Sequence, residues 1–169
     1  MDRRSLLNLS LISALGLAVP CSAIAQTKPL KDQLVGTWTL MSWEQTGKDG
    51  AKTQDFSANP KGVSSFDANG HFFVMFARPD LPNIASADRT KVTPQEAHTI
   101  NVGSIAYFGT YTVDEPSKTV SLKIESSTFP NQLGIDQKRV ITSLTADELK
   151  YTNTTSSGGP IDTVFRRAK

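Results

Sequence analysis

The feature that most constrains the fold is an alternation of polar and apolar residues that recurs along the chain after residue 34. It is clearest in TVSLKIESST (residues 119–128), where every second residue from Val120 to Ile124 is apolar. Successive side chains of a β-strand point to opposite faces, so such a strand has one apolar and one solvated face. Runs of Gly, Asp, Asn, Pro and Ser separate these segments, which is typical of antiparallel sheets. The sequence therefore predicts an all-β domain.

Eight segments carry a strand pattern, and short turns join most of them. Asn69-Gly70 is a pair typical of two-residue β-hairpins. Eight consecutive antiparallel strands favour an up-and-down barrel over a sandwich, because closing the sheet removes its edges. Such a barrel has room for its own side chains or for one small ligand. The expected strands are residues 35–44, 62–66, 71–76, 104–113, 119–128, 137–144, 148–154 and 161–167.

One connection, residues 77–103, is too long for a hairpin, and its prolines rule out a continuous strand. Within it, Thr93 fits a helix N-cap and Pro94 the first helical position, so we expect a short helix here. This segment is our candidate for a lid over a pocket. We expect His98, on the same helix, to be solvated.

Residues 1–25 have the parts of a secretory signal peptide: a basic start, an apolar run and the small-x-small pattern Ala23-Ile24-Ala25. The run is shorter than the roughly 20 residues of a membrane span. We expect cleavage after Ala25, a periplasmic or secreted protein, and no membrane span in the mature chain. Arg3-Arg4 leaves both the Sec and the twin-arginine route open. Residues 26–33 would be an N-terminal extension and residues 34–167 the barrel domain.

Charge and composition exclude several classes of function. Removal of residues 1–25 changes the formal net charge from +2 to +1, which provides no basic surface for nucleic acid or an anionic membrane. The only cysteine, Cys21, leaves with the signal, so the mature chain has no disulfide. The two histidines lack metal-site spacing, and phosphate-binding and nucleophile-elbow motifs are absent from the sequence. We expect no metal, no cofactor and a monomer.

The stretch LVGTWTLMSWE (residues 34–44) holds both tryptophans of the chain. At the start of the first strand, Trp38 can point inward and plug one end of a barrel, while Gly36 permits a bend or a close approach at the rim. The last strand ends in Arg166-Arg167. If this strand closes beside the first, one guanidinium can lie over the indole ring. We interpret these four residues as a structural plug of the barrel end.

Candidate ligand-binding residues lie on separate segments. Tyr107 and Tyr111 share one face of their strand, and an inward orientation would give a pocket two hydroxyl groups; structural packing is the alternative. Phe129 and Asn131, in FPNQLG, would supply apolar cover and an amide at a barrel mouth, or simply shape a turn.

Three further side chains bear on a pocket. His71 follows the hairpin turn and could be a pocket acid or base, since its ordinary pKa is about 6.5. Phe73, on the same strand, is a further candidate ligand contact. The strand around residue 139 alternates ambiguously, and we favour Val140 inward and Arg139 outward.

The motifs GTWTLMSWE, FDANGHFFVMF, YFGTYTVD, FPNQLG and the terminal FRR, in this order, resemble the bacterial and fungal lipocalin-like domain family. The resemblance covers residues 34–167. It implies a calycin-type β-barrel with a pocket for a small apolar molecule, and no assigned reaction. The strand after GTYTVD has no histidine where many relatives carry one, so no chemistry that depends on it is expected.

We therefore expect an exported protein that binds a small apolar or amphipathic molecule in its barrel. Two alternatives stay open. One is an isomerase- or cyclase-type enzyme that uses a tyrosine or His71 in the same pocket. The other is a ligand-free structural or interaction module, whose barrel is filled by its own side chains.

Overall fold

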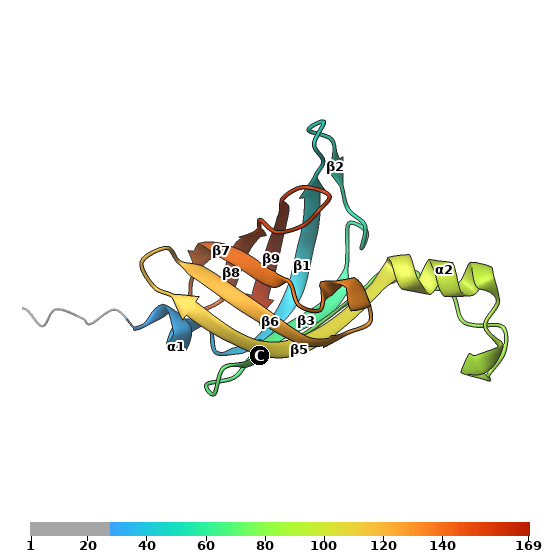
Figure 1. The fold of residues 1–169 in the computed structure, drawn as a ribbon, viewed down its shortest axis with the longest axis horizontal. Coiled ribbons are helices and arrows are strands. Elements are labelled where there is room, and N and C mark those ends of the chain that lie inside the picture. Colours follow the sequence, from blue (N-terminus) through green and yellow to red (C-terminus); the bar gives the residue numbers. More distant parts are fainter. Residues whose placement is uncertain (1–27) are drawn as a thin grey trace, which may run out of the picture.

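The computed structural model describes residues 28–169, so the predicted signal peptide and residues 26 and 27 lie outside the described residues. Eight strands form one closed antiparallel barrel in sequence order, and β1 pairs with β9 to close it (Figure 1). The predicted eight-stranded up-and-down barrel is confirmed. Its strands are β1 (Gly36–Thr46), β3 (Lys61–Phe66), β4 (His71–Ala77), β5 (Ser104–Asp114), β6 (Thr119–Ser127), β7 (Asp136–Leu144), β8 (Glu148–Asn153) and β9 (Ile161–Arg167). The two-residue strand β2 (Lys52–Thr53) pairs with the end of β1.

Within residues 28–169, four short helices accompany the barrel: α1 (Leu30–Leu34), η1 (Arg89–Lys91), α2 (Pro94–Gly103) and η2 (Pro130–Gln132). The helix predicted within residues 77–103 is confirmed as α2. A capping box starts it, in which Thr93 Oγ1 accepts from the Glu96 N–H and the Glu96 carboxylate accepts from the Thr93 N–H. No helix within residues 28–169 is long and apolar enough to cross a bilayer.

The connection before β5 does not act as the lid that we expected. α2 extends from the start of β5 away from the barrel, and it does not cover either barrel end (Figure 1). Gly103 is its one buried residue, so the helix lacks an apolar face that could seal a pocket. Only its last turn, at Val102, reaches the cavity described below.

A β-bulge in β1 explains how both tryptophans point inward. Residues five apart in a regular strand face opposite sides of the sheet. The pairing of β1 with β9 shifts between Leu40 and Ser42, which leaves Met41 as an extra residue. Trp38 and Leu40 face inward before the bulge, and Trp43 faces inward after it. The first strand therefore contributes an indole to each half of the barrel.

Aromatic rings fill most of the interior. They pack edge to face or tilted, with ring centroids 5.2 Å apart for Phe66 and Tyr111 and 5.4 Å apart for Tyr151 and Phe165, in the range that aromatic pairs prefer. The large buried side chains include Trp38, Phe66, Phe72, Phe76, Tyr107, Tyr111, Tyr151 and Phe165. The interior space that the barrel keeps is at one end.

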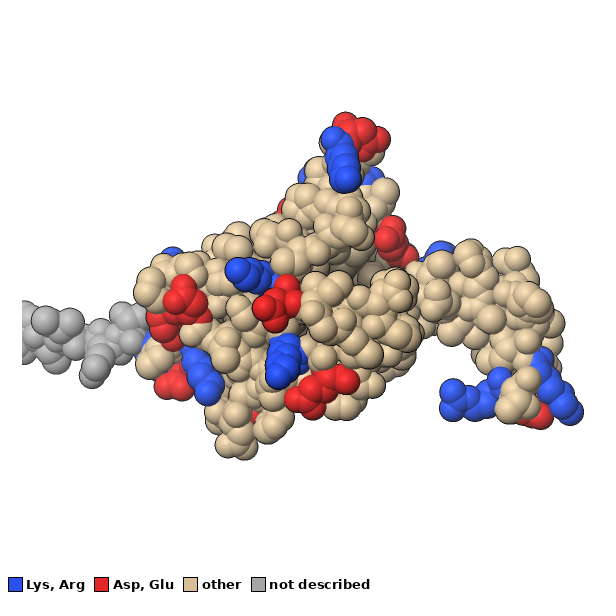
Figure 2. All heavy atoms as spheres, viewed as in Figure 1, with Lys and Arg blue, Asp and Glu red and all other residues tan. Residues whose placement is uncertain are grey.

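Charges of both signs are interspersed over the barrel face seen in Figure 2, without a large region of one sign. Several form ion pairs, such as Lys52 with Glu44 at 2.6 Å and Lys150 with Glu148 at 3.0 Å. This distribution agrees with the near-zero net charge.

Candidate functional site

Trp38 closes the barrel end next to α1. Its side chain is fully buried, and its Nε1–H donates to the Leu34 carbonyl oxygen at 2.8 Å. The Arg167 guanidinium carbon lies 4.0 Å from the centre of the indole ring, while its two Nη atoms donate to the carbonyl oxygens of Gln33 and Val35 at 2.7 and 2.9 Å. Arg167 thus ties the last strand to the backbone that enters the first.

Gly36 makes the approach of Arg167 possible. Its φ is +132°, a backbone conformation that favours glycine, and a methyl group at residue 36 would lie 2.6 Å from Arg167 Nη1. Arg166 points the other way and is exposed to solvent. Of the two arginines assigned to the plug, Arg167 is therefore the one that lies on the indole.

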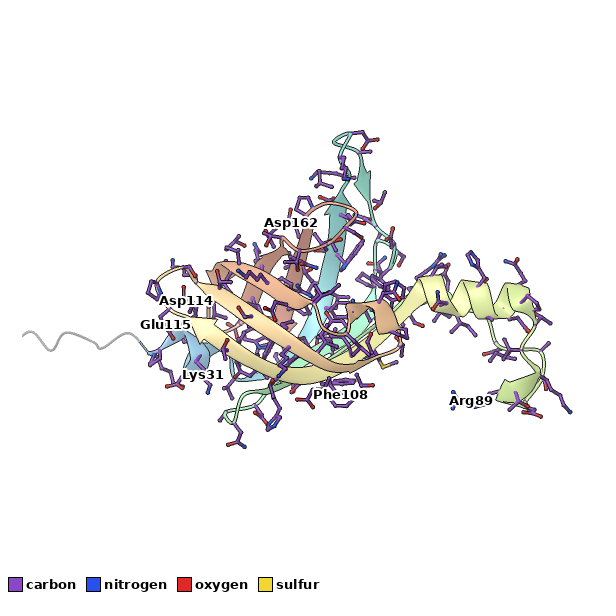
Figure 3. All side chains as sticks on the ribbon, viewed as in Figure 1. Lys31, Arg89, Phe108, Asp114, Glu115 and Asp162 are labelled. Carbon is purple, nitrogen blue, oxygen red and sulfur yellow. The ribbon has the colours of Figure 1, made fainter. Side chains whose placement is uncertain are left out.

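A carboxylate fixes α1 over this plugged end. Glu115, in the β5–β6 turn, accepts from the Leu30 N–H at 2.9 Å and from the Lys31 N–H at 3.2 Å. Figure 3 shows Glu115 beside Lys31 at the barrel end that α1 covers. The first N–H groups of a helix have no partner within it, so a carboxylate there satisfies them.

The opposite end of the barrel contains a cavity of about 140 Å³. Its apolar wall comes from Trp43 on β1, Phe56 in the β2–β3 loop and Phe76 on β4. Its polar wall comes mainly from β7, β8 and β9. The lining residues are Trp43, Asp55, Phe56, Phe76, Val102, Ile105, Tyr107, Gln132, Arg139, Tyr151, Asn153, Ile161 and Thr163.

Arg139 lies in this cavity, and the expectation that it points outward is wrong. The side chain is 3% exposed, and Ile141 faces inward in phase with it. Val140, which we expected inside, is on the other face of β7 and half-buried. Our error was to assume that the inward face of β7 is apolar, whereas Gln137 and Arg139 both point into the barrel.

The three tyrosines of the chain are all buried. Tyr107 and Tyr151 line the cavity, and the Tyr107 hydroxyl accepts from Arg139 Nη2 at 3.4 Å. Burial raises the pKa of the Tyr151 phenol, so it remains a neutral O–H group at physiological pH. Tyr111 lies outside the cavity, toward the plugged end, where Lys31 Nζ is 6.0 Å from its ring centre and its hydroxyl donates to the Asp67 carbonyl oxygen at 2.7 Å. Burial, followed by the charges of Asp67 and Asp32, raises the pKa of Tyr111 to about 12.

Two other predicted contacts lie outside the barrel. His71 is exposed, and its Nδ1 lies 3.2 Å from Asp67 Oδ2 in the hairpin turn. Phe73 is exposed on the outer face of β4, opposite Phe108 of β5, which Figure 3 shows pointing out from the sheet. We correct their assignment to the pocket, because His71 and Phe73 are in phase with each other and out of phase with the inward-facing Phe72 and Val74.

Phe129 and Asn131 lie at the rim of the open end. Both are exposed and line a groove of about 420 Å³ beside the cavity. Gln132, Asn153 and Ile161 line both spaces. The FPNQLG segment therefore forms part of the mouth, and Gln132 is its residue that reaches the cavity.

Four uncharged polar residues of the cavity were absent from our sequence candidates: Gln132, Tyr151, Asn153 and Thr163. For three of them the signal was present. Leu149 and Tyr151 set the inward phase of β8, which places Asn153 inside. Ile161 and Phe165 set the phase of β9, which places Thr163 inside. No three His, Cys, Asp or Glu side chains gather as a candidate metal site within residues 28–169.

One family model covers most of the barrel. The family model described as a lipocalin-like domain matches residues 35–161, and none of the curated proteins compared with the chain matches it. Among solved structures, a redesigned β-barrel is 18% identical, covers 85% of this chain and 98% of its own, and has a TM-score of 0.44. A de novo designed fluorescence-activating β-barrel is 13% identical, covers 83% and 99%, and has a TM-score of 0.42. A redesigned β-barrel bound to DFHBI is 18% identical, covers 83% and 100%, and has a TM-score of 0.42. The chain belongs to the lipocalin-like domain family.

Proposed function

We propose that this protein is an exported binding protein that takes up a small amphipathic molecule at the open end of its barrel. The observation that carries the proposal is the cavity of about 140 Å³, in which Arg139 and two phenols face Trp43 and Phe76. Small-molecule sites are typically concave and mostly apolar, with a few polar groups that fix orientation. The proposed action is passive binding, driven by burial of apolar surface.

The size of the cavity restricts what enters it. A cavity of about 150 Å³ holds a molecule of the size of benzene. A larger ligand would place one ring or a short chain inside and leave the rest in the groove at the mouth. Exposed apolar side chains occur at this mouth, on Val102, Phe129 and Ile135. They would cover such an external part.

The cavity favours binding over proton-transfer catalysis. A general acid or base works best when its pKa is near the operating pH, whereas burial moves the pKa of Tyr151 upward. His71, the other proton donor considered, lies on the outside of the barrel. Export remains part of the proposal on the basis of residues 1–25 and their cleavage pattern after Ala25.

Native mass spectrometry of the protein purified from its own periplasm or medium tests the proposal. We expect a stoichiometric added mass of a small organic compound, or uptake of one from a panel of indole, benzyl alcohol, benzoate and hexanoate. Thr163→Leu fills the cavity and should abolish uptake, because Thr163 points inward. Val164→Leu, on the outer face of the same strand, is the matched control. Absence of binding in the native protein, or equal binding in both variants, would contradict the proposal.

A further inference from the structure

The buried guanidinium of Arg139 is a feature of the cavity that burial of apolar surface alone does not explain. It lies 3% exposed among aromatic side chains. An arginine keeps its charge at every physiological pH. Moving an ion from water into a protein interior is costly unless an opposite charge compensates it. A charge kept at this position therefore needs a partner.

The described part of the chain supplies no negative partner. None of the ion pairs within residues 28–169 involves Arg139. Its Nη2 donates to Gln137 Oε1 at 3.0 Å and to the Tyr107 hydroxyl at 3.4 Å, and its Nη1 donates to the Lys138 carbonyl oxygen at 3.2 Å. Its guanidinium carbon lies 5.7 Å from the centre of the Tyr151 ring. These dipoles and this π face hold the group in place but do not neutralise it.

The guanidinium also keeps hydrogen-bonding capacity. It has five N–H donors, and the three bonds above use three of them. Of the two remaining donors one interacts with the Tyr151 hydroxyl, which leaves at least one for a ligand in the cavity that Arg139 lines. Arginine matches the geometry and charge of a carboxylate closely, and such charge-assisted bonds are stronger than neutral ones.

From this unneutralised cation we infer that the cavity selects a small molecule that carries one carboxylate, which pairs with Arg139 and leaves its apolar body against Trp43 and Phe76. The inference rests on the binding function proposed above and names the chemical class of the ligand.

The neighbouring groups fit this ligand. The Tyr107 hydroxyl accepts its bond from Arg139 and so retains its own proton for a carboxylate oxygen. Tyr151, on the same wall, is a second O–H donor. Asp55 is the acidic residue of the lining, and it lies exposed in the loop between β2 and β3. Because it is exposed, solvent screens its charge, and its repulsion of a carboxylate held at the buried Arg139 is weak.

The first test compares two probes of the same shape on the unmodified protein. Titration calorimetry at pH 7 measures the binding of benzoate and of its neutral isostere benzamide. We expect benzoate to bind about tenfold or more tightly, because only benzoate pairs with the buried charge. We also expect benzoate to shift the Nε resonance of Arg139 in an NMR spectrum. Benzamide binding as tightly as benzoate would overturn the inference without the need of a variant.

The second test moves the charge. Arg139→Met replaces the guanidinium by an apolar chain, a change that buried positions often tolerate, and circular dichroism checks its folding. We expect it to bind benzamide and to lose the preference for benzoate. Lys138→Gln removes the same charge from the exposed neighbour on β7 and should keep the preference. A preference that survives Arg139→Met would overturn the assignment of the carboxylate to this residue.

The outcomes separate this inference from the function on which it rests. Binding of benzamide or benzyl alcohol without a benzoate preference would leave the binding function intact and reject the anion. Failure of every probe to bind would reject both. Displacement of benzoate by sulfate or chloride at equal concentration would show that the site holds any small anion, and would reject selection of a carboxylate.

Discussion

At the scale of single residues, the plugged end brings three residues together. Trp38 fills the end of the barrel, Arg167 lies over its ring, and Gly36 leaves the space through which the guanidinium passes. The two carbonyl oxygens that Arg167 binds belong to the backbone that leads into β1. The arrangement thus joins the first and last strands at the point where the barrel closes.

Gly36→Ala should destabilise the protein by about 3 kcal/mol, because the new methyl group meets Arg167 and the residue keeps a positive φ. Gly50→Ala is the matched control: its φ is +82°, and no atom lies within 4 Å of the added methyl group. We expect it to cost about 1 kcal/mol, from backbone strain alone. Urea denaturation measures both.

A double variant checks that the conflict involves Arg167. Adding Arg167→Met to Gly36→Ala should cost less than the sum of the two single changes, since the clash disappears with the guanidinium. Equal costs for Gly36→Ala and Gly50→Ala would mean that Arg167 moves aside freely. The contacts of Arg167 in the plug would then contribute no stability to the folded protein.

The sequence predicted the orientation of single residues correctly where the pattern of a strand allowed only one face to point inward. It failed where either face could have done so. Trp38 had to face inward at the start of a strand whose other neighbours are threonines. Arg139 was misplaced, because polarity was taken as the mark of the outer face. The inward position of Arg139 can be predicted only when Ile141 is taken to mark the inward face of β7, because the two residues lie on the same face.

At the scale of elements, strand alternation predicted the existence and order of the barrel strands, and turn residues predicted the hairpins between them. The β-bulges could not be predicted, since an extra residue changes the phase without a mark in the pattern. Besides β1, bulges occur where β5 pairs with β6 and where β7 pairs with β8. At the first of these, Gly109 permits close backbone approach, because a methyl group there would overlap the Lys123 carbonyl oxygen.

The docking of α1 also escaped sequence reasoning, because the residue that holds it is distant in the chain. Glu115→Gln should make the amides of α1 exchange hydrogen several-fold faster, since a neutral amide binds the Leu30 and Lys31 N–H groups less strongly than a carboxylate. Hydrogen-exchange mass spectrometry measures this. Glu125→Gln, at an exposed position of β6, should leave α1 unchanged. Equal protection in both variants would show that the helix packs without its carboxylate.

At the scale of the whole molecule, the barrel has two unlike ends. One is sealed by Trp38 and covered by α1, while the other holds the cavity and its apolar mouth. Aromatic rings occupy the space between the two ends. The interior of the barrel is therefore mainly a packed core, and the cavity takes up only a small part of it. In the proposed function, a ligand would enter past the loops that join β2 to β3, β6 to β7 and β8 to β9, which line the cavity and its mouth.

This packed interior makes the stability of the whole molecule sensitive to alkaline pH. Unfolded tyrosines ionise at a pKa of about 10, whereas the folded pKa of Tyr111 is about 12 and that of Tyr151 is also raised. A raised folded pKa contributes stability that is fully present below pH 10 and is lost as pH rises through the folded value, because the unfolded chain releases its protons first. The free energy of unfolding, measured in urea between pH 8 and about pH 11.5, should therefore fall with pH.

The variant Tyr111→Phe tests the part that Tyr111 plays in this fall. Its free energy of unfolding should be about 1 kcal/mol lower at pH 8, because the hydrogen bond to Asp67 is lost, and should then fall less steeply with pH. If the free energy of unfolding falls equally steeply with pH in the two proteins, water reaches the Tyr111 hydroxyl in the folded barrel. The end of the barrel that Trp38 plugs would then be less tightly sealed than its packing indicates.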